Sequence, residues 1–147
     1  MDNDCFNDLV IAYYNTNYRI VTPEIVIEIG RPCQALKDFA SENNIDKWAV
    51  ITAHNPASVA LSSTENARRD KKLRLRLEEL GKKYFDLIGE AAPPSDWPPE
   101  KGYFAGVDSL EEAVEMAADF GQHAILYGDE CALPSIVWVD LEGRVGS

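Results

Sequence analysis

The sequence predicts an α+β domain of α/β-like character, with three or four helices packed on one mixed β-sheet of about five or six strands. The 147 residues are 46% hydrophobic and 27% charged, which is the balance of an ordinary globular domain. Short apolar runs alternate along the chain with segments of helical period. A chain of this length fits one domain, residues 1–147, which can bury a sizeable core.

The first part of the chain predicts a short helix followed by two strands. Apolar residues up to Tyr14 have the spacing of one helix face. Residues 18–21 and 24–29 then alternate β-branched and polar side chains around Thr22-Pro23. This pattern is typical of a hairpin or a bent strand pair.

A second helix is expected after Gly30-Arg31-Pro32, because proline suits the first helical position. Its inner face should contain Leu36, Phe39 and Ala40. Asn43-Asn44 is expected to end this helix in a left-handed turn. The apolar run from Trp48 to Thr52 then predicts a strand that is buried on both faces.

A strongly basic helix is expected to begin at Ser62, because Glu65 three positions later completes a capping-box pattern. Gly81 is expected to end it, and its inner stripe should be Leu73, Leu77 and Leu80. The segment Arg68–Lys83 holds eight of the 14 basic residues and has a net charge of +5, whereas the rest of the chain carries −16. This segment is either a solvated face that balances an acidic body or a docking surface for an anionic ligand or partner.

A second capping box, Ser109 and Glu112, opens a helix that is expected to end at Gly121. The inward residues of this helix should be Leu110, Ala113, Val114 and Ala117. Further strands are expected at residues 84–88, 103–107, 124–127 and 136–139. The order strand, helix, strand around the basic helix predicts a right-handed crossover between parallel strands.

The proline-rich segment 90–101 predicts a long connection between two of these strands. Trp97 at its centre either covers a pocket or pins the loop to the core.

Charge and cysteine content limit the partners and the compartment. A net charge of −11 argues against direct binding to nucleic acid or to anionic membranes. No apolar run is long enough to span a bilayer, and the acidic start lacks the pattern of a signal peptide. Three widely spaced cysteines, Cys5, Cys33 and Cys131, favour free thiols in a reducing cytosol, so a cytoplasmic location is expected.

The loop after Thr52 is the expected ligand site, because ligands of α/β sheets bind beyond the carboxyl ends of strands. The basic helix would point its positive end at the same place. Arg69 would pair with the charge of an anionic ligand, and nearby amides and hydroxyls would hydrogen-bond it. The candidate ligand-binding residues are Thr52, His54, Asn55, Ser58, Glu65, Asn66, Arg69 and Gln122.

Several of these residues have an equally good structural interpretation. Asn55-Pro56 suits the start of a capped helical turn. Glu65 and Arg69 have the i,i+4 spacing of a helical salt bridge. Gln122 suits a buried amide that ties loops together.

No complete catalytic motif occurs, so whether the chain is an enzyme stays open. His54 with Ser58 or Thr52 would give a base and a nucleophile, but no G-x-S-x-G elbow accompanies them. No dinucleotide or P-loop motif occurs, so no cofactor is expected. Too few potential ligands lie near His123 in the sequence for zinc, so no metal is expected.

The chain also contains the pattern T-A-x-N-P-x-S, then an E-N pair, then F-G-Q before an apolar strand. The residues that carry it are Thr52, Ala53, Asn55, Pro56, Ser58, Glu65, Asn66 and Phe120-Gly121-Gln122. This pattern resembles that of the bacterial domain-of-unknown-function family numbered 3293, in which tryptophan is common where this chain has His54. Because that family has no established activity, the resemblance supports the fold and leaves the function open.

The sequence therefore predicts a domain that binds an anionic small molecule, such as a nucleotide-like one, in the loop after Thr52. The alternative is an interaction or inhibitor protein. Such a protein would use its acidic body to mimic nucleic acid, as small phage-type inhibitors do, or its basic helix, residues 65–83, to bind an acidic protein.

Overall fold

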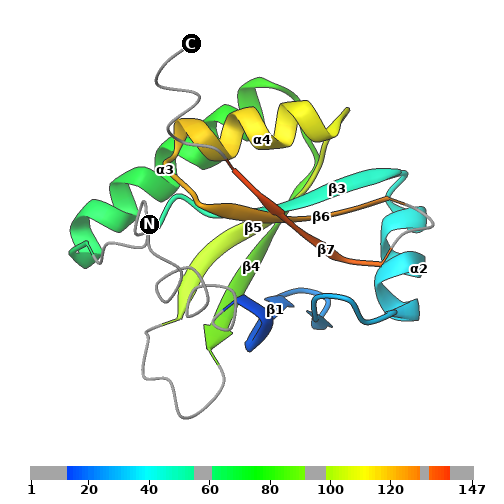
Figure 1. Cartoon of the computed structure of the whole chain (residues 1–147). Coiled ribbons are helices and arrows are strands. Elements are labelled where there is room, and N and C mark those ends of the chain that lie inside the picture. The colour runs from blue at the N-terminus through cyan, green and yellow to red at the C-terminus, as the bar shows by residue number, and fades with distance from the viewer. Residues whose placement is uncertain (1–12, 55–60, 92–98, 130–132, 140–147) are drawn as a thin grey trace.

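The computed structural model describes residues 13–54, 61–91, 99–129 and 133–139, which form three helices and one seven-stranded sheet (Figure 1). The strands are β1 (Thr16–Ile20), β2 (Ile25–Ile27), β3 (Lys47–Ile51), β4 (Tyr84–Ala91), β5 (Glu100–Gly106), β6 (Ala124–Asp129) and β7 (Ser135–Trp138). The helices are α2 (Gln34–Glu42), α3 (Ser63–Glu79) and α4 (Leu110–Asp119). Most of the helix expected before Tyr14 lies outside the described residues.

The sheet has the strand order β2-β1-β4-β5-β3-β6-β7, and all of its strand pairs are antiparallel. The predicted α+β class is confirmed, but the expected mixed sheet of five or six strands is wrong. The parallel strands expected on either side of the basic helix are present: β3 and β4 each pair antiparallel with β5, so they run parallel to each other, although β5 lies between them. The run β3-α3-β4-β5-α4-β6 with this strand order has the βαββαβ arrangement of ferredoxin-like folds.

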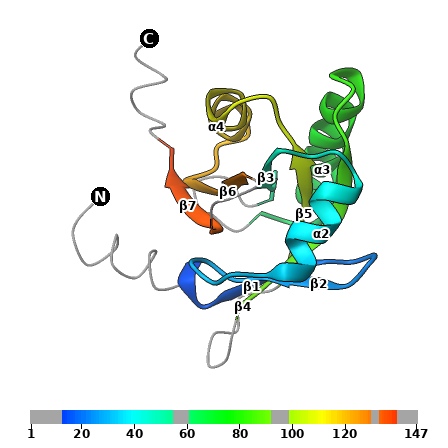
Figure 2. The same cartoon turned by 90° about the vertical axis from the view of Figure 1, so that its right-hand side faces the viewer.

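Helices cover both faces of the sheet (Figures 1 and 2). Helices α3 and α4 share one core with Ala49 and Ile51, whereas α2 shares another with Trp48 and Val50. Because side chains alternate along a strand, β3 supplies both cores, and the predicted burial of both its faces is confirmed. None of the described helices is both long and apolar enough to cross a membrane.

The ends of the helices follow the predicted local signals. The Ser62 and Ser109 hydroxyls each accept a hydrogen bond at 3.1 Å from the backbone N–H three residues later, so both caps are confirmed. Three left-handed residues follow the helices: Asn44 (φ 56°), Gly81 (φ 70°) and Gly121 (φ 69°). Pro32 lies before the first residue of α2 and not in it, because Cys33 is the N-cap.

The buried stripe of α3 differs from the expected one. Leu73 and Leu77 are fully buried, but Leu80 is 49% exposed, because it follows the last helical residue where the chain turns toward β4. Asn66 and Asp70 occupy the remaining inward positions. The helix thus presents two polar side chains to the sheet along its N-terminal half.

The expected connection at residues 90–101 is shorter than the sequence suggested. Strand β4 continues to Ala91 and β5 begins at Glu100, so both ends of that segment belong to strands. The pairing of Gly89 with Glu100 explains this extension, since each strand supplies the other with backbone partners. Trp97 lies outside the described residues.

Candidate functional site

Thr52 ties the end of β3 to β5. Its hydroxyl donates to the carbonyl oxygen of Lys101 at 2.6 Å and accepts the backbone N–H of His54 at 3.0 Å. The strands approach closely here because Gly102 has no side chain, and a Cβ there would lie 2.7 Å from the carbonyl oxygen of Ile51. The Thr52 hydroxyl is therefore engaged within the fold.

Arg69 and Gln122 converge on the same strand end. Arg69 Nε donates to the carbonyl oxygen of Ala53 at 2.7 Å, and its Nη2 donates to that of Phe120. Gln122 Nε2 donates to the carbonyl oxygens of His54 at 3.0 Å and Phe120 at 3.2 Å. These two side chains fasten the end of β3 to the end of α4. The interpretation of Gln122 as a buried, hydrogen-bonded amide is confirmed.

Glu65 and Asn66 lie in the first turn of α3. Glu65 is exposed, and its carboxylate lies 3.6 Å from Arg68 and not beside Arg69, with which a helical salt bridge was the structural alternative. Asn66 is 8% exposed, and its amide nitrogen donates to the carbonyl oxygen of Leu61 at 3.4 Å. The two other candidate residues, Asn55 and Ser58, lie outside the described residues.

A buried acid that the sequence did not single out lies one turn beyond Asn66. Asp70 is 7% exposed, and its Oδ2 accepts the Tyr103 hydroxyl at 2.8 Å and lies 3.5 Å from the Lys101 ammonium. Its Oδ1 is buried and has no hydrogen-bond partner among the residues that the structure describes. An unpaired buried acceptor costs about 1–3 kcal/mol, and more when charged, so native proteins rarely contain one without a reason.

His54 lies in the electrostatic field of the same groups. Burial lowers the pKa of His54 from 6.5, while Asp70 and Glu100 have smaller, opposite effects and Lys101 a further lowering one. Its imidazole is therefore neutral at pH 7 and offers one donor and one acceptor. Burial and the Asp70 contact raise the pKa of Tyr103, so its hydroxyl stays a donor. We call His54, Asp70, Glu100, Lys101 and Tyr103 the Asp70 cluster.

The sequence contained one signal for this cluster. Asn66, Asp70, Leu73 and Leu77 have the spacing of a single helix face, which places two polar residues on the apolar stripe. Nothing in the sequence around Tyr103 and Lys101 indicated that they would lie beside Asp70. They belong to β5, and the alternation of a strand does not reveal which strand will pair with it.

Most of the basic residues of α3 and the turn after it are bound within the fold. Three of them form ion pairs: Arg68 with Glu65, Arg76 with Asp119 at 2.6 Å, and Lys82 with Asp108 at 3.0 Å and Glu112 at 2.8 Å. Two others bind backbone carbonyl oxygens: Arg69 binds two of them, and Lys83 binds that of Asn43. The acids of α4 and the loop before it thus neutralise Arg76 and Lys82. Lys71 and Lys72 remain exposed.

His123 and Cys33 also have side chains that can react or bind metals. For His123 the described contact is made by the backbone, and for Cys33 it is a long contact of the thiol. The carbonyl oxygen of His123 accepts the Val139 N–H at 2.8 Å, and the Cys33 thiol is free and lies 3.8 Å from the carbonyl oxygen of Val26. Over the described ranges, no three His, Cys, Asp or Glu side chains are grouped so that they could hold a metal ion.

The comparison with protein families identifies one family. A family model described as "Protein of unknown function (DUF3293)" matches residues 51–125, just over half of the chain. The matched segment runs from the end of β3 to the start of β6 and contains the whole Asp70 cluster. No curated protein and no solved structure matches the chain. The chain belongs to the DUF3293 family of proteins of unknown function.

Proposed function

We propose that the chain binds a small molecule at the end of β3, beside the N-terminal half of α3, and that the ligand donates a hydrogen bond to Asp70. The observation that carries this proposal is the buried Oδ1 of Asp70, which has no partner among the described residues. The other oxygen of the same carboxylate is held by Tyr103 and lies near Lys101, so the group has a fixed orientation. A fixed acceptor without a donor is what a binding site for an N–H or O–H group requires.

The contacts of Arg69 change the class of ligand that we propose. An anionic ligand was expected because Arg69 would neutralise it, but the Arg69 guanidinium uses Nε and Nη2 on backbone carbonyls. Lys101 lies beside the cluster, yet its ammonium is already 3.5 Å from Asp70. A carboxylate and a neutral imidazole favour a neutral or cationic ligand with N–H donors, such as an amine, amidine, amide or nucleobase.

An ordered water molecule is the competing explanation for Asp70. A buried water makes about three hydrogen bonds to polar groups and would satisfy Oδ1 equally well. The two explanations differ in their consequence. If Asp70 only binds water, no small molecule stabilises the protein in a way that depends on this carboxylate.

The test is a thermal-shift screen of wild-type protein, Asp70→Asn and Asp38→Asn. The panel contains amines, amidines, amides and nucleosides, together with nucleotides, sugar phosphates and carboxylates. A ligand at 100 times its Kd stabilises a protein by about 2.7 kcal/mol, which raises the Tm of a chain of this size by about 5–10 °C. We expect such a shift from a donor-bearing compound in wild-type protein and Asp38→Asn and its loss in Asp70→Asn.

The controls separate binding from folding. Asp38 is exposed and accepts a hydrogen bond from Gln34, so Asp38→Asn removes the same charge away from the site. Tyr103→Phe should lower the basal Tm and reduce the ligand shift without abolishing it, because Asp70 keeps Oδ1 but loses the hydroxyl that fixes its orientation. The absence of any shift across the panel, or an equal shift in wild-type protein and Asp70→Asn, would overturn the proposal.

A further inference from the structure

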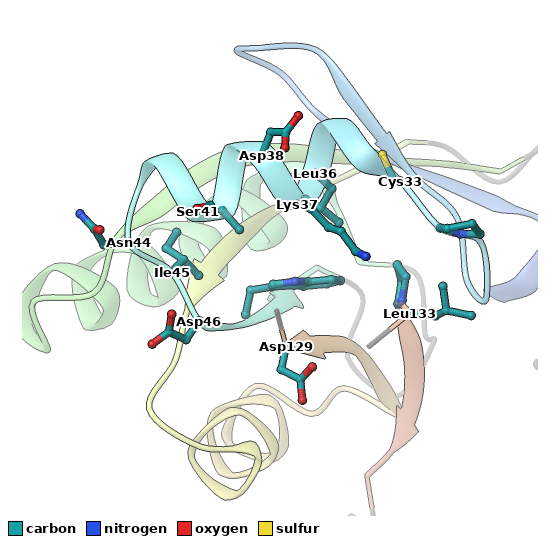
Figure 3. A pocket seen from close by; sticks show the side chains of 14 residues that line it. Cys33, Leu36, Lys37, Asp38, Ser41, Asn44, Ile45, Asp46, Asp129 and Leu133 are labelled. Atoms are coloured by element: carbon teal, nitrogen blue, oxygen red, sulfur yellow. The ribbon is translucent and has the colours of Figure 1, made fainter. Parts of the chain in front are cut away.

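A pocket lies on the opposite face of the sheet from the Asp70 cluster, between α2, the start of β3 and Leu133-Pro134 (Figure 3). Its volume is about 520 Å³, which is within the range of small-molecule sites. We call it the α2 pocket. Its residues lie outside the segment that matches the DUF3293 family, so its role is independent of the function proposed above.

The floor of the α2 pocket is apolar. Leu36, Ala40, Ile45 and Trp48 line it and are all buried, and Leu133 lines it with 46% of its surface exposed. Burying apolar ligand surface against such a floor is favourable in proportion to the area removed from water. The floor therefore suits the hydrocarbon part of a ligand.

Trp48 is the most firmly placed residue of this floor. Its ring centroid lies 5.1 Å from that of Phe104, with 33° between the two planes. On another side it lies against Gly128, where a Cβ would be only 2.4 Å from the indole Cζ2. An aromatic surface held in this way loses little conformational freedom when a ligand packs on it.

The charged residues at the rim point in different directions. Figure 3 shows Lys37 extending from α2 across the mouth, toward the side of Leu133. The carboxylates of Asp38, Asp46 and Asp129 point away from the pocket in the same view. Asp38 is held there by Gln34, whose amide nitrogen donates to it at 3.0 Å. Within the described part of the chain no ion pair of Lys37 is found, so its ammonium can meet a ligand.

We propose that the α2 pocket binds an amphipathic organic anion, namely an aromatic carboxylate. The aromatic body packs on Trp48 and Leu36, and the carboxylate pairs with Lys37. Because a single exposed ion pair contributes little, the apolar contact supplies most of the affinity, and Lys37 sets the preference for an acid over an amine. The three rim carboxylates point away from the pocket, and salt at physiological ionic strength weakens their repulsion of the bound anion.

The test uses naphthoate and the matched amine naphthylmethylamine as probes. Each is titrated into the full chain while the indole N–H resonance of Trp48, assigned with a Trp48→Phe variant, is followed by NMR. A ligand of this size is expected to bind with a Kd on the order of 1 mM. We expect a saturable shift with naphthoate and up to about fivefold weaker binding of the amine, since an exposed charge contact is worth at most about a fivefold change.

Two charge reversals give the matched comparison. Lys37→Glu should weaken naphthoate binding about tenfold, because it replaces attraction by repulsion at the mouth. Lys71→Glu makes the same charge change on exposed α3 and should leave the Kd within about twofold. The proposal is overturned by no saturable shift up to about 10 mM, by equal or tighter binding of the amine, or by an unchanged Kd in Lys37→Glu. None of these outcomes involves Asp70, so they are distinct from a failure of the proposed function.

Discussion

Arg69 joins three parts of the chain through one guanidinium group. It extends from α3 and donates hydrogen bonds to two carbonyl oxygens, that of Ala53 after the end of β3 and that of Phe120 at the end of α4. Its Cζ also lies 6.0 Å from the centre of the Phe120 ring. Arginine suits this place because its planar fork presents several donors in fixed directions, which the single ammonium of lysine does not.

Replacement of Arg69 should therefore destabilise the fold more than replacement of its neighbour. We expect Arg69→Lys to lower the free energy of unfolding by about 1–2 kcal/mol and Arg69→Ala by about 2–4 kcal/mol, because buried carbonyls lose their donors. Arg68→Ala is the control, since it removes an exposed ion pair worth less than about 1 kcal/mol. Urea denaturation measures all three. Equal losses in Arg69→Ala and Arg68→Ala would mean that the carbonyl contacts add no stability.

The lowered pKa of His54 predicts a pH-dependent stability. Burial makes the folded protein bind a proton at His54 less readily than the unfolded chain, in which the pKa is near 6.5. As the pH falls through 6.5 toward the folded pKa, the unfolded chain takes up the proton first, so stability declines; it recovers as the pH rises. His54→Gln should lack this contribution. The difference in unfolding free energy between wild-type protein and His54→Gln should thus change below about pH 6.5 and be flat above it. A constant difference from about pH 5 to 8 would contradict this origin.

Among single residues, the sequence could predict those whose burial follows from their place beside a local helix signal. The burial of Gln122 followed from its place between a helix stop and a strand. Asp70 was missed because it lies in a run of basic residues, where it contributed only to the net charge of the window and its position on the inner face of the helix was not considered. Its burial follows from helix phase, four residues from Asn66 and three from Leu73, and its contact with Tyr103 follows from sheet pairing.

At the scale of helices and strands, the helix starts at Ser62 and Ser109 were predictable, whereas the facing ends of β4 and β5 and the sheet order were not. Ser62 and Ser109 act on N–H groups three residues away, so a short window of sequence contains the whole interaction. The neighbours of β3 are β5 and β6, which lie far along the chain. The order strand, helix, strand around α3 predicted parallel strands and a mixed sheet. Strands β3 and β4 do run parallel, but β5 lies between them, so the hydrogen-bonded pairs are antiparallel.

The corrected stripe of α3 gives a prediction at this scale. Leu77 is fully buried and Leu80 is 49% exposed, although both were expected to face the core. Leu77→Ala should lower the free energy of unfolding by about 2–5 kcal/mol through lost burial and a cavity, whereas Leu80→Ala should cost less than about 1 kcal/mol. Parallel urea or thermal denaturation of the two variants checks the difference. Similar losses would indicate that α3 continues its contact with the core past Glu79.

For the whole molecule, part of the uneven charge of the sequence is compensated by ion pairs between helices. The window Arg68–Lys83 carries +5 in a chain of −11, yet Arg76 pairs with Asp119 and Lys82 with Glu112. Both pairs join α3 or its following turn to α4. The linear sequence could show the asymmetry but not its compensation, because Asp119 lies 43 residues after Arg76 and Glu112 lies 30 residues after Lys82. The net charge summed over a stretch of sequence therefore overstates the positive electrostatic field that a binding partner would meet at the surface.

The sheet also separates the two candidate sites. Asp70 and Tyr103 lie on the face that α3 and α4 cover, whereas the α2 pocket lies on the other face. Strand β3 connects the two regions, since its end leads to His54 and its start supplies Trp48. The separation makes the two proposals independently testable on one protein.

Trp48 and Gly128 are direct neighbours across the β3–β6 pair, and any side chain at position 128 would collide with the indole. This contact restricts the order in which the two positions could have changed during evolution. A larger residue at 128 becomes acceptable only after Trp48 has been replaced by a smaller one. The reverse order would pass through a chain in which β6 could no longer lie against β3. In any relative that retains the tryptophan, position 128 is therefore expected to be glycine.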